Sequence, residues 1–286
     1  MPVHFNKVVI IGVGLIGASL GLAGRKRGLF GEIIGVGRSK ANLDAAAGMG
    51  AVDRYAHDPK DACKNADLIV LATPVDRILS IGREIAPLLG KGSCLTDVGS
   101  VKQALVEGLD QAVPQGVWFV GAHPIAGSEE SGAAAGRPDL FQGARTVLTP
   151  TRSTNPEALK KVRSLWEGVG SIVTEMDAAE HDMILAAVSH LPHVAAYALV
   201  NTLAGMQDRY PDIPSFAAGG FKDITRIVGS HPEMWKEICR MNKKNILKML
   251  EKYTETLKGI QGKIEQDHFE ELGRLFEQAR GFRKGL

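Results

Sequence analysis

A chain of 286 residues, 44% of them hydrophobic, is long enough for two domains and can bury a sizeable core. Its 34 basic and 32 acidic residues leave a net charge of +2, which gives no reason to expect a nucleic acid or a membrane surface as a partner. The cysteines Cys63, Cys94 and Cys239 are odd in number and widely spaced, which argues against a disulfide framework and against a zinc site.

The chain begins MPVHFNKVVIIGVG, which has no basic region followed by a signal-type apolar stretch. We also expect no segment of about eighteen uncharged apolar residues, the length that a membrane-spanning helix needs. The cysteine pattern fits a reducing compartment. These features predict a soluble, unprocessed protein of the cytoplasm.

Short β-rich runs alternate with helix-like stretches from residue 7 to about residue 175. The runs are KVVIIGVG, EIIGVGR, ADLIVLATP, GSCLTDVG, VWFVGAHP, RTVLTP and SIVTEM. This alternation predicts βαβ units and a parallel sheet. We therefore expect an α/β domain over residues 1–176.

The pattern changes near Thr174, and from Ala178 onward helical periodicity dominates without a convincing strand. An all-α domain is expected over residues 177–286, with its clearest break at YPDIPSFAAGGF (210–221). The segment MWKEICRMNKKNILKMLEKYTETLKGI is expected to be a long helix that covers a core within one chain or between two chains. Its apolar positions are Met234, Ile238, Met241, Ile246 and Met249.

The first βα junction, VVIIGVGLIGASLGLA, has the spacing of a dinucleotide-binding loop. Gly12 permits a tight turn, Gly14 lets the backbone approach a pyrophosphate, and Gly17 lets helix and strand pack closely. Leu15 and Ile16 begin the helix whose N-terminus would face the phosphates. Strand, spacing and helix agree, so we expect a Rossmann-type site for NAD or NADP; an ordinary glycine-rich turn is the alternative.

Thr73 and Pro74 end the apolar run ADLIVLATP at its carboxyl edge, where open α/β sheets bind ligands. By themselves they mark only the end of a strand. Together with the glycines, they are expected to line the cofactor site.

The end of the second run, EIIGVGRSK, bears on the choice of cofactor. NAD-selective domains place Asp or Glu about twenty residues beyond the glycines, to bond the ribose 2′-hydroxyl. Here Gly37 takes that position, and Arg38 and Ser39 follow it. A guanidinium and a hydroxyl can bind a 2′-phosphate, so NADP is expected to be accepted at least as well as NAD. Alternatively, Arg38 stacks on the adenine of either cofactor.

Four further motifs, LTDVGSVK, GAHPIAGSEESG, SHLPH and GGFKDITRI, follow the glycine loop in this order. With them the sequence resembles the prephenate/arogenate dehydrogenase family of tyrosine biosynthesis over nearly its whole length. The resemblance implies an N-terminal nucleotide-binding domain, a helical domain that forms a homodimer, and an active site between them. The implied reaction is oxidative decarboxylation of prephenate to 4-hydroxyphenylpyruvate, or of arogenate to tyrosine, with hydride transfer to NAD(P)+ and no metal.

The resemblance implies that His123 is catalytic, bonding the ring hydroxyl and accepting its proton, a role that suits a side chain with a pKa near neutrality. Ser100 is implied to contact the same hydroxyl and to orient the histidine, and Glu129 to belong to the substrate pocket. From the residues alone, His123 is a structural histidine, Ser100 the N-cap of the next helix, and Glu129 a solvated loop carboxylate.

In SHLPHVAAYAL, His190 and His193 lie three residues apart on a helical segment that Pro192 perturbs. A metal site is a weak alternative because no neighbouring carboxylate or cysteine completes a ligand set. The resemblance assigns His193 to the substrate pocket and leaves His190 as a supporting or structural residue.

In GGFKDITRI, the resemblance makes Arg226 the cation for a substrate carboxylate, a task that suits a planar guanidinium. Asp223 lies three residues earlier and would steady Arg226. A purely structural salt bridge between the two is the alternative.

Two other functions remain open at the level of sequence. A two-domain dehydrogenase of the 3-hydroxyacid or pyrroline-carboxylate reductase type shares the layout. The 3-hydroxyacid enzymes, however, have an asparagine one turn after a catalytic lysine, whereas Arg226 follows Lys222 here. A non-catalytic nucleotide-binding protein would not need His123 and Arg226 together.

Overall fold

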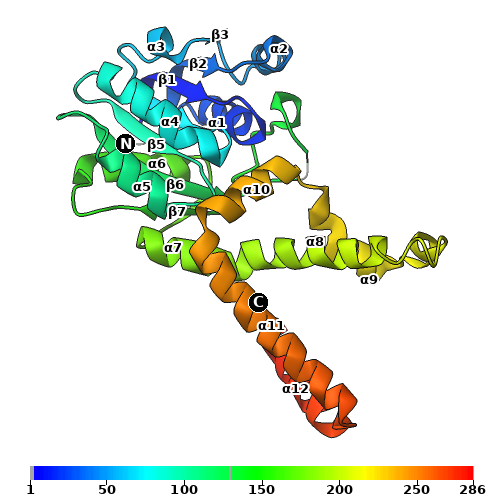
Figure 1. Ribbon diagram of the computed structural model, residues 1–286. Helices are drawn as coiled ribbons and strands as arrows, with labels where there is room; N and C mark the ends of the chain where they lie inside the picture. Colours follow the sequence, from blue (N-terminus) through cyan, green and yellow to red (C-terminus); the bar gives the residue numbers. More distant parts are fainter. Residues whose placement is uncertain (1–2, 129, 286) are drawn as a thin grey trace.

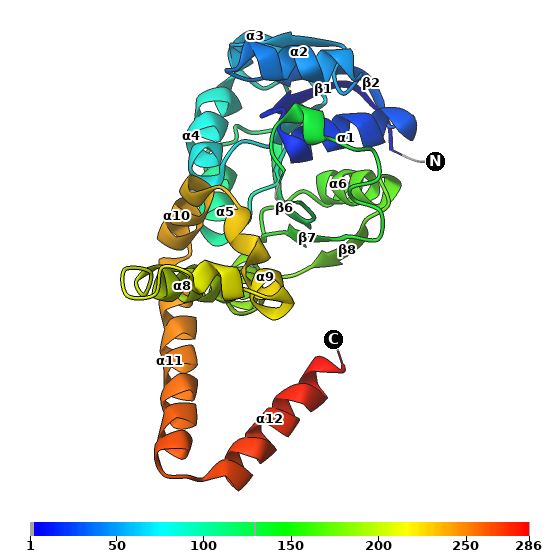
Figure 2. The same cartoon turned by 90° about the vertical axis from the view of Figure 1, so that its right-hand side faces the viewer.

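The computed structural model describes residues 3–128 and 130–285, which form an α/β domain followed by a helical domain (Figure 1). The α/β domain is built on a sheet of eight strands. Figure 2 shows that the long helix before the last one extends away from this domain and that the last helix turns back in its direction. The predicted fold class, a Rossmann-type domain followed by an all-α domain, is confirmed.

Six strands of the sheet are parallel and lie in the order β3-β2-β1-β4-β5-β6. All four residues of β4 are buried, as expected for a parallel strand that helices cover on both faces. The six strands are β1 (Phe5–Ile11), β2 (Phe30–Val36), β3 (Arg54–Ala56), β4 (Leu68–Leu71), β5 (Cys94–Asp97) and β6 (Trp118–Ile125).

The last two strands, β7 (Arg145–Thr149) and β8 (Ile172–Glu175), depart from the predicted parallel sheet. β7 pairs antiparallel with β6, and β8 then pairs parallel with β7. The described residues between β6 and β7 form no α-helix that could cross over the sheet, and the direction of the strand reverses. The motif GAHPIAGSEESG therefore lies at the end of β6 and at the start of this return.

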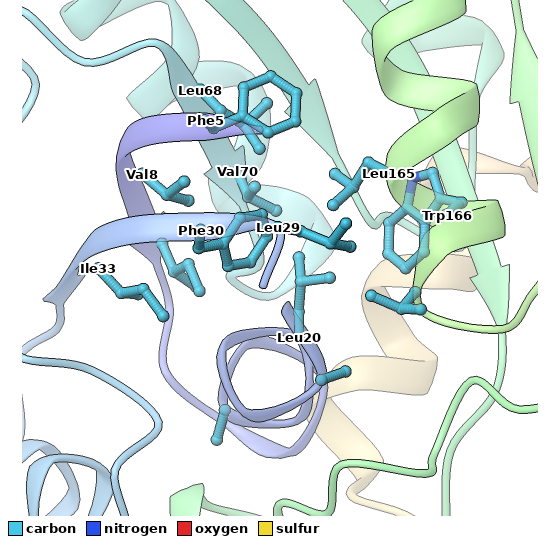
Figure 3. Close-up of a cluster of buried hydrophobic side chains, with 14 of the residues drawn as sticks. Phe5, Val8, Leu20, Leu29, Phe30, Ile33, Leu68, Val70, Leu165 and Trp166 are labelled. Carbon is cyan, nitrogen blue, oxygen red and sulfur yellow. The ribbon is translucent and has the colours of Figure 1, made fainter. Parts of the chain in front are cut away.

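Helices cover both faces of the sheet, and alternate residues of β1 contribute to two separate cores. Val8 and Ile10 belong to the core that Figure 3 shows, whereas Val9 and Ile11 belong to the other. The first core includes side chains of α1 (Leu15–Lys26), α2 (Lys40–Gly48) and α6 (Pro156–Gly168). The second includes side chains of α3 (Pro59–Ala62), α4 (Val75–Ile85) and α5 (Gln103–Asp110).

The described residues after Glu175 contain helices and no strand. They form α7 (Ala178–Leu185), a π-helical segment Ala186–His190, α8 (Leu191–Ala204), α9 (Gly219–Thr225), α10 (Pro232–Met241), α11 (Lys243–Glu265) and α12 (Phe269–Arg283). The π-helical turn precedes Pro192, which has no backbone N–H to continue a regular helix. α10 packs on the α/β domain because Trp235 and Ile238 join its second core.

The long helix predicted from Met234 onward is wrong at one point, because α10 and α11 are separate helices. Asn242 lies between them with φ −103° and ψ 27°. Its buried side-chain amide donates to the backbone oxygen of Asp182 at 2.7 Å and contacts His190 Nδ1 at 3.1 Å. These contacts fix the position of Asn242 and place the break in the chain there.

One helical segment comes closer to the composition of a membrane-spanning helix than the sequence analysis expected. Ala178–Ala204 is long and apolar enough to cross a membrane by length and composition, and 22% of its apolar window is buried. Large apolar side chains elsewhere in the helical domain are exposed as well, including Phe216 at 81% and Phe282 at 75%. A single chain therefore leaves much of the apolar surface of this domain uncovered.

Candidate functional site

The loop between β1 and α1 can accept the pyrophosphate of a dinucleotide. Gly12 has φ +98°, and a Cβ there would lie 2.5 Å from the backbone of Ala72. A Cβ at Gly17 would lie 2.2 Å from the oxygen of Gly12, whereas one at Gly14 would meet nothing within 4 Å. The backbone is thus tightly packed beneath the loop and open at Gly14, as close approach of a ligand requires.

The first turn of α1 has the positive electrostatic character that a phosphate group requires. Leu15 and Ile16 are its first residues, and their backbone N–H groups have no partner within the helix. No acidic residue lies in that turn, so nothing opposes a phosphate at the helix N-terminus. The residues of the loop therefore fit a dinucleotide cofactor.

Thr73 and Pro74 follow β4 directly beside this loop. A Cβ at Gly12 would lie 2.6 Å from the backbone nitrogen of Thr73. The Thr73 hydroxyl oxygen is buried and has no hydrogen-bond partner among the described residues. Since buried hydroxyls are normally bonded, this atom is available to a ligand at the carboxyl edge of the sheet. Pro74 is the N-cap residue of α4.

Arg38 and Ser39 lie just beyond β2 and are exposed. Ser39 caps α2 by accepting a hydrogen bond from the backbone of Asn42 at 3.3 Å. The sequence analysis missed Asn42, whose side chain donates to the oxygen of Val13 at 2.6 Å and accepts from the nitrogen of Ala133 at 2.7 Å. Asn42 thereby joins the glycine loop to the segment that follows β6, although no motif points to it.

His123 lies near the end of β6 and is 7% exposed. Its Nδ1 is 2.8 Å from Nε2 of His181, and the two rings meet edge to face. Burial, followed by the neighbouring His181, holds the pKa of His123 well below its ordinary value of 6.5. His123 is therefore a neutral imidazole at neutral pH, able to accept a proton.

His181 and Asp182 are two buried residues of α7 that the sequence analysis missed. His181 Nδ1 lies 2.8 Å from Asp182 Oδ1. The same carboxylate accepts the backbone N–H groups of Lys102 at 2.7 Å and Gln103 at 3.0 Å. A chain of contacts thus runs from β6 through α7 to the start of α5. The residues AEHDM lie outside the recognised motifs, so only their adjacency in the sequence hinted at this pair.

The structure contradicts one of the two sequence interpretations of Ser100. α5 begins at Gln103 with Lys102 as its N-cap residue, so the prediction that Ser100 caps this helix is wrong. The amide groups at the helix start are bonded instead by Asp182. His123 Nδ1 is bonded to His181, and the implied contact of Ser100 with the substrate hydroxyl stays a prediction. Ser100 is half-buried in the bend after β5.

The motif LTDVGSVK also contains a buried ion pair between Asp97 and Lys102. The Lys102 ammonium donates to the oxygen of Ala122 at 2.9 Å, and Asp97 accepts the N–H groups of Gly99 and Ala122. These bonds join the ends of β5 and β6 immediately beside His123. Breaking such a buried pair by removing one partner is costly, so the backbone there is held firmly.

His193 and His190 have different surroundings on the helical domain. The half-buried His193 ring stacks on Trp235 at 3.6 Å between centroids, and its Nδ1 is 2.8 Å from the oxygen of Ser189. His190 is buried, with its Nδ1 next to the Asn242 amide. Burial lowers the pKa of His190 to about 4. His190 is thus bonded within the protein, whereas no described residue bonds the second ring nitrogen of His193.

Arg226 begins the short helical turn Arg226–Gly229 after α9. Burial is the main cause that lowers the pKa of His193, and the positive charge of Arg226 lowers it further. The two side chains therefore lie close enough to interact electrostatically. Asp223 is exposed and forms no ion pair within the described part of the chain, so no contact supports its predicted steadying of Arg226. Glu129 lies outside the described residues.

No group of three or more His, Cys, Asp or Glu side chains in residues 3–128 and 130–285 is arranged to hold a metal ion. His190 and His193 in particular point to different partners, Asn242 and Trp235. The three cysteines are free thiols.

Two family models match the chain on either side of residue 176. The nucleotide-binding domain of prephenate dehydrogenase matches residues 20–175, and its dimerization domain matches residues 177–278. A prephenate dehydrogenase of Bacillus subtilis is 38% identical over 98% of this chain and 76% of its own length.

Solved structures agree with these matches. A prephenate dehydrogenase from A. aeolicus in complex with hydroxyphenyl propionate and NAD+ is similar with a TM-score of 0.89 and 34% identity, over 97% of both chains. An arogenate dehydrogenase from Synechocystis has a TM-score of 0.82 and 34% identity, over 97% of this chain and 99% of its own. The glycine loop, the buried histidine of β6 and both domain matches thus agree, and the chain belongs to the prephenate dehydrogenase family.

Proposed function

We propose that this oxidoreductase converts prephenate to 4-hydroxyphenylpyruvate, or arogenate to tyrosine, with NAD(P)+ in tyrosine biosynthesis. Hydride leaves the ring carbon that bears the hydroxyl and is accepted by nicotinamide, which is the chemistry that the bound cofactor supplies. The ring carboxylate leaves as carbon dioxide, and the electrons of the broken C–C bond complete the aromatic ring. The observation behind this proposal is the neutral, buried His123 at the sheet edge of a dinucleotide-binding domain.

The chain's own residues have distinct roles in this proposal. His123 accepts the hydroxyl proton as hydride departs and returns it to the phenolate oxygen after carbon dioxide has left. Ser100 bonds the same hydroxyl. His193, Arg226 and Glu129 surround the substrate, and Arg226 binds a carboxylate, while Asp223 flanks Arg226. The cofactor is bound by Gly12, Gly14, Leu15, Ile16, Gly17, Arg38, Ser39, Thr73 and Pro74.

The proposal is tested with purified protein, the two substrates and the two cofactors. We expect reduction of the cofactor with matched release of carbon dioxide when prephenate or arogenate is added. The ratio of kcat/KM for the two substrates then decides whether the preferred substrate is prephenate, whose side chain carries a keto group, or arogenate, whose side chain carries an amine. Cofactor binding without turnover of either substrate would instead support a non-catalytic nucleotide-binding protein.

We propose NADP as a cofactor at least as good as NAD, because Gly37 leaves no carboxylate at the end of β2 and Arg38 is exposed beside it. Arg38→Ala is expected to lower kcat/KM for NADP roughly tenfold or more relative to NAD, the scale of one charge-assisted hydrogen bond. Lys40→Ala, which removes a neighbouring exposed cation paired with Asp44, is the control. An unchanged cofactor ratio in Arg38→Ala, or a wild-type preference for NAD above roughly tenfold, would reject Arg38 as a phosphate ligand.

A homodimer formed through the helical domain is the proposed assembly. The match to a dimerization domain and the exposed apolar side chains of α11 and α12, such as Leu257 and Phe276, support it. At micromolar concentration, light scattering should give twice the mass of the 30.6 kDa chain. Leu257→Glu should weaken association, whereas the adjacent exposed exchange Lys258→Glu should not. A wild-type monomer at this concentration would contradict the proposal.

The two domains are proposed to divide at residues 176 and 177, between β8 and α7. The substrate is a small molecule, and we propose that the enzyme works in the cytoplasm without nucleic acid or membrane partners. The long apolar helix Ala178–Ala204 then belongs to the dimer interface.

A further inference from the structure

We propose that His181 and Asp182 set the tautomer of His123, so that His123 presents an unprotonated Nε2 to the substrate. The inference rests on the proposed function and extends it to two positioning residues that do not touch the substrate. It starts from the contacts His123 Nδ1 to His181 Nε2 and His181 Nδ1 to Asp182 Oδ1, each 2.8 Å long. All three side chains are buried.

The direction of these hydrogen bonds is decided at Asp182. Its carboxylate accepts backbone N–H groups on both oxygens, from Lys102 on Oδ1 and from Gln103 on Oδ2. Two fixed donors leave Asp182 the role of acceptor, as an ionised carboxylate. The nitrogen that faces its Oδ1, His181 Nδ1, must therefore carry a proton and donate it.

The position of the proton on His181 determines the position of the proton on His123. Burial lowers the pKa of His181, which keeps this ring neutral with a single N–H group. That N–H is on Nδ1, so His181 Nε2 has a lone pair and can only accept. His123 Nδ1 must then donate to it, and the single proton of neutral His123 is placed on Nδ1.

The remaining nitrogen, His123 Nε2, becomes the base by elimination. It has no hydrogen-bond partner among residues 3–128 and 130–285, and His123 keeps a small exposed area. The opposite arrangement requires a protonated Asp182 or a cationic His181. A cationic His181 would be buried near Lys102, whose ammonium opposes a second positive charge. The carboxylates of Asp182 and Asp97 favour the cation, but burial outweighs them and the pKa of His181 is lowered.

This arrangement also stabilises the state that follows proton transfer. The substrate O–H bond breaks and an Nε2–H bond forms, which makes His123 a cation. Its Nδ1–H still donates to His181, which in turn donates to the Asp182 carboxylate, so the new charge lies at the end of a hydrogen-bonded chain that ends in an anion. The proton returns along the same path to the phenolate oxygen.

The direct test is the tautomer itself, read by long-range ¹H–¹⁵N NMR of the histidine-labelled full chain. In the wild type, His123 is expected to show a protonated Nδ1 and a pyridine-type Nε2. In Asp182→Asn, the amide N–H₂ can donate to His181 and reverse both rings, which places the proton of His123 on Nε2. His268→Gln is the control, because His268 is an exposed histidine at the start of α12 and has no contact with the three residues of the network; it should leave the His123 signals unchanged.

Kinetics provide the second readout. Asp182→Asn should lower kcat by roughly 10²-fold to 10⁴-fold, the upper figure being the effect of the analogous exchange in a serine protease triad, with a much smaller change in KM. His181→Phe removes the acceptor and should show a similar loss. His181→Gln keeps an oxygen acceptor in reach of His123 and should recover part of kcat. A purely structural role predicts equal losses in His181→Phe and His181→Gln that follow their melting temperatures.

Two results would overturn the proposal: a wild-type His123 protonated on Nε2, or full turnover in folded His181→Phe. The wild-type spectrum decides the matter even if every variant fails to fold. The outcomes also separate this inference from the proposed function. A wild type with the expected tautomer that turns over neither prephenate nor arogenate contradicts the reaction, but not the hydrogen-bond directions.

Discussion

Replacing His123 with Asn should lower kcat by roughly 10²-fold or more, the usual scale for loss of a general acid or base. Asn can still occupy the buried position at the end of β6 and bond to His181, but it cannot accept the hydroxyl proton. Cofactor affinity should stay native because the glycine loop and Thr73 are untouched. Steady-state rates and cofactor titrations by fluorescence measure the two quantities separately.

The matched control is His268→Asn, the same chemical change at an exposed histidine between α11 and α12. It should turn over like the wild type. If His123→Asn also retains the wild-type kcat, His123 has no part in the chemistry and the proposed proton path is wrong.

Removing the guanidinium in Arg226→Ala should raise KM for the substrate about tenfold to a hundredfold. The reason is the loss of a charge-assisted contact to a carboxylate, which contributes roughly 1.5 to 3 kcal/mol. kcat should change less than KM, because a carboxylate far from the reacting carbon is bound similarly in the ground state and the transition state. Arg226→Lys should lie between wild type and alanine, since it keeps the charge without the planar fork.

A structural role of Arg226 predicts a different result. In that case Arg226→Ala would lower the melting temperature and leave KM near its native value. Arg280→Ala, which removes an exposed arginine of α12 paired with Glu277, controls for the general effect of losing a surface cation. Thermal unfolding and circular dichroism of the variants separate the two explanations.

Local patterns in the sequence were sufficient to predict the features that depend on neighbouring residues in the chain. The glycine spacing at Gly12, Gly14 and Gly17 requires a tight turn and close packing, and the structure has both. The change from β-rich runs to helical periodicity is visible near Thr174, and the first helix after the last strand begins four residues later, at Ala178. The apolar runs likewise predicted seven of the eight strands, missing only the three-residue β3.

Strand direction and helix breaks were less predictable. The run RTVLTP indicates a strand, but its direction depends on how residues 126–144 return the chain, and β7 is antiparallel to β6. Asn242 separates α10 from α11 because its amide bonds to Asp182 and His190, about fifty to sixty residues earlier in the chain. The helical pattern continues through Asn242, so only this distant contact reveals the break.

The sequence by itself determined the dinucleotide loop and, through its ordered motifs, the dehydrogenase family, because the residues of each motif are close together in the chain. Only the tertiary structure decided which ring nitrogen of His123 carries the proton. His123 meets His181 across 58 residues, and Asp182 meets Lys102 across 80 residues. Hydrogen-bond direction depends on which donors surround a carboxylate in space, and no pattern along the chain contains that information. The proton of His123 is therefore assigned by the packing of α7 against β6 and the start of α5.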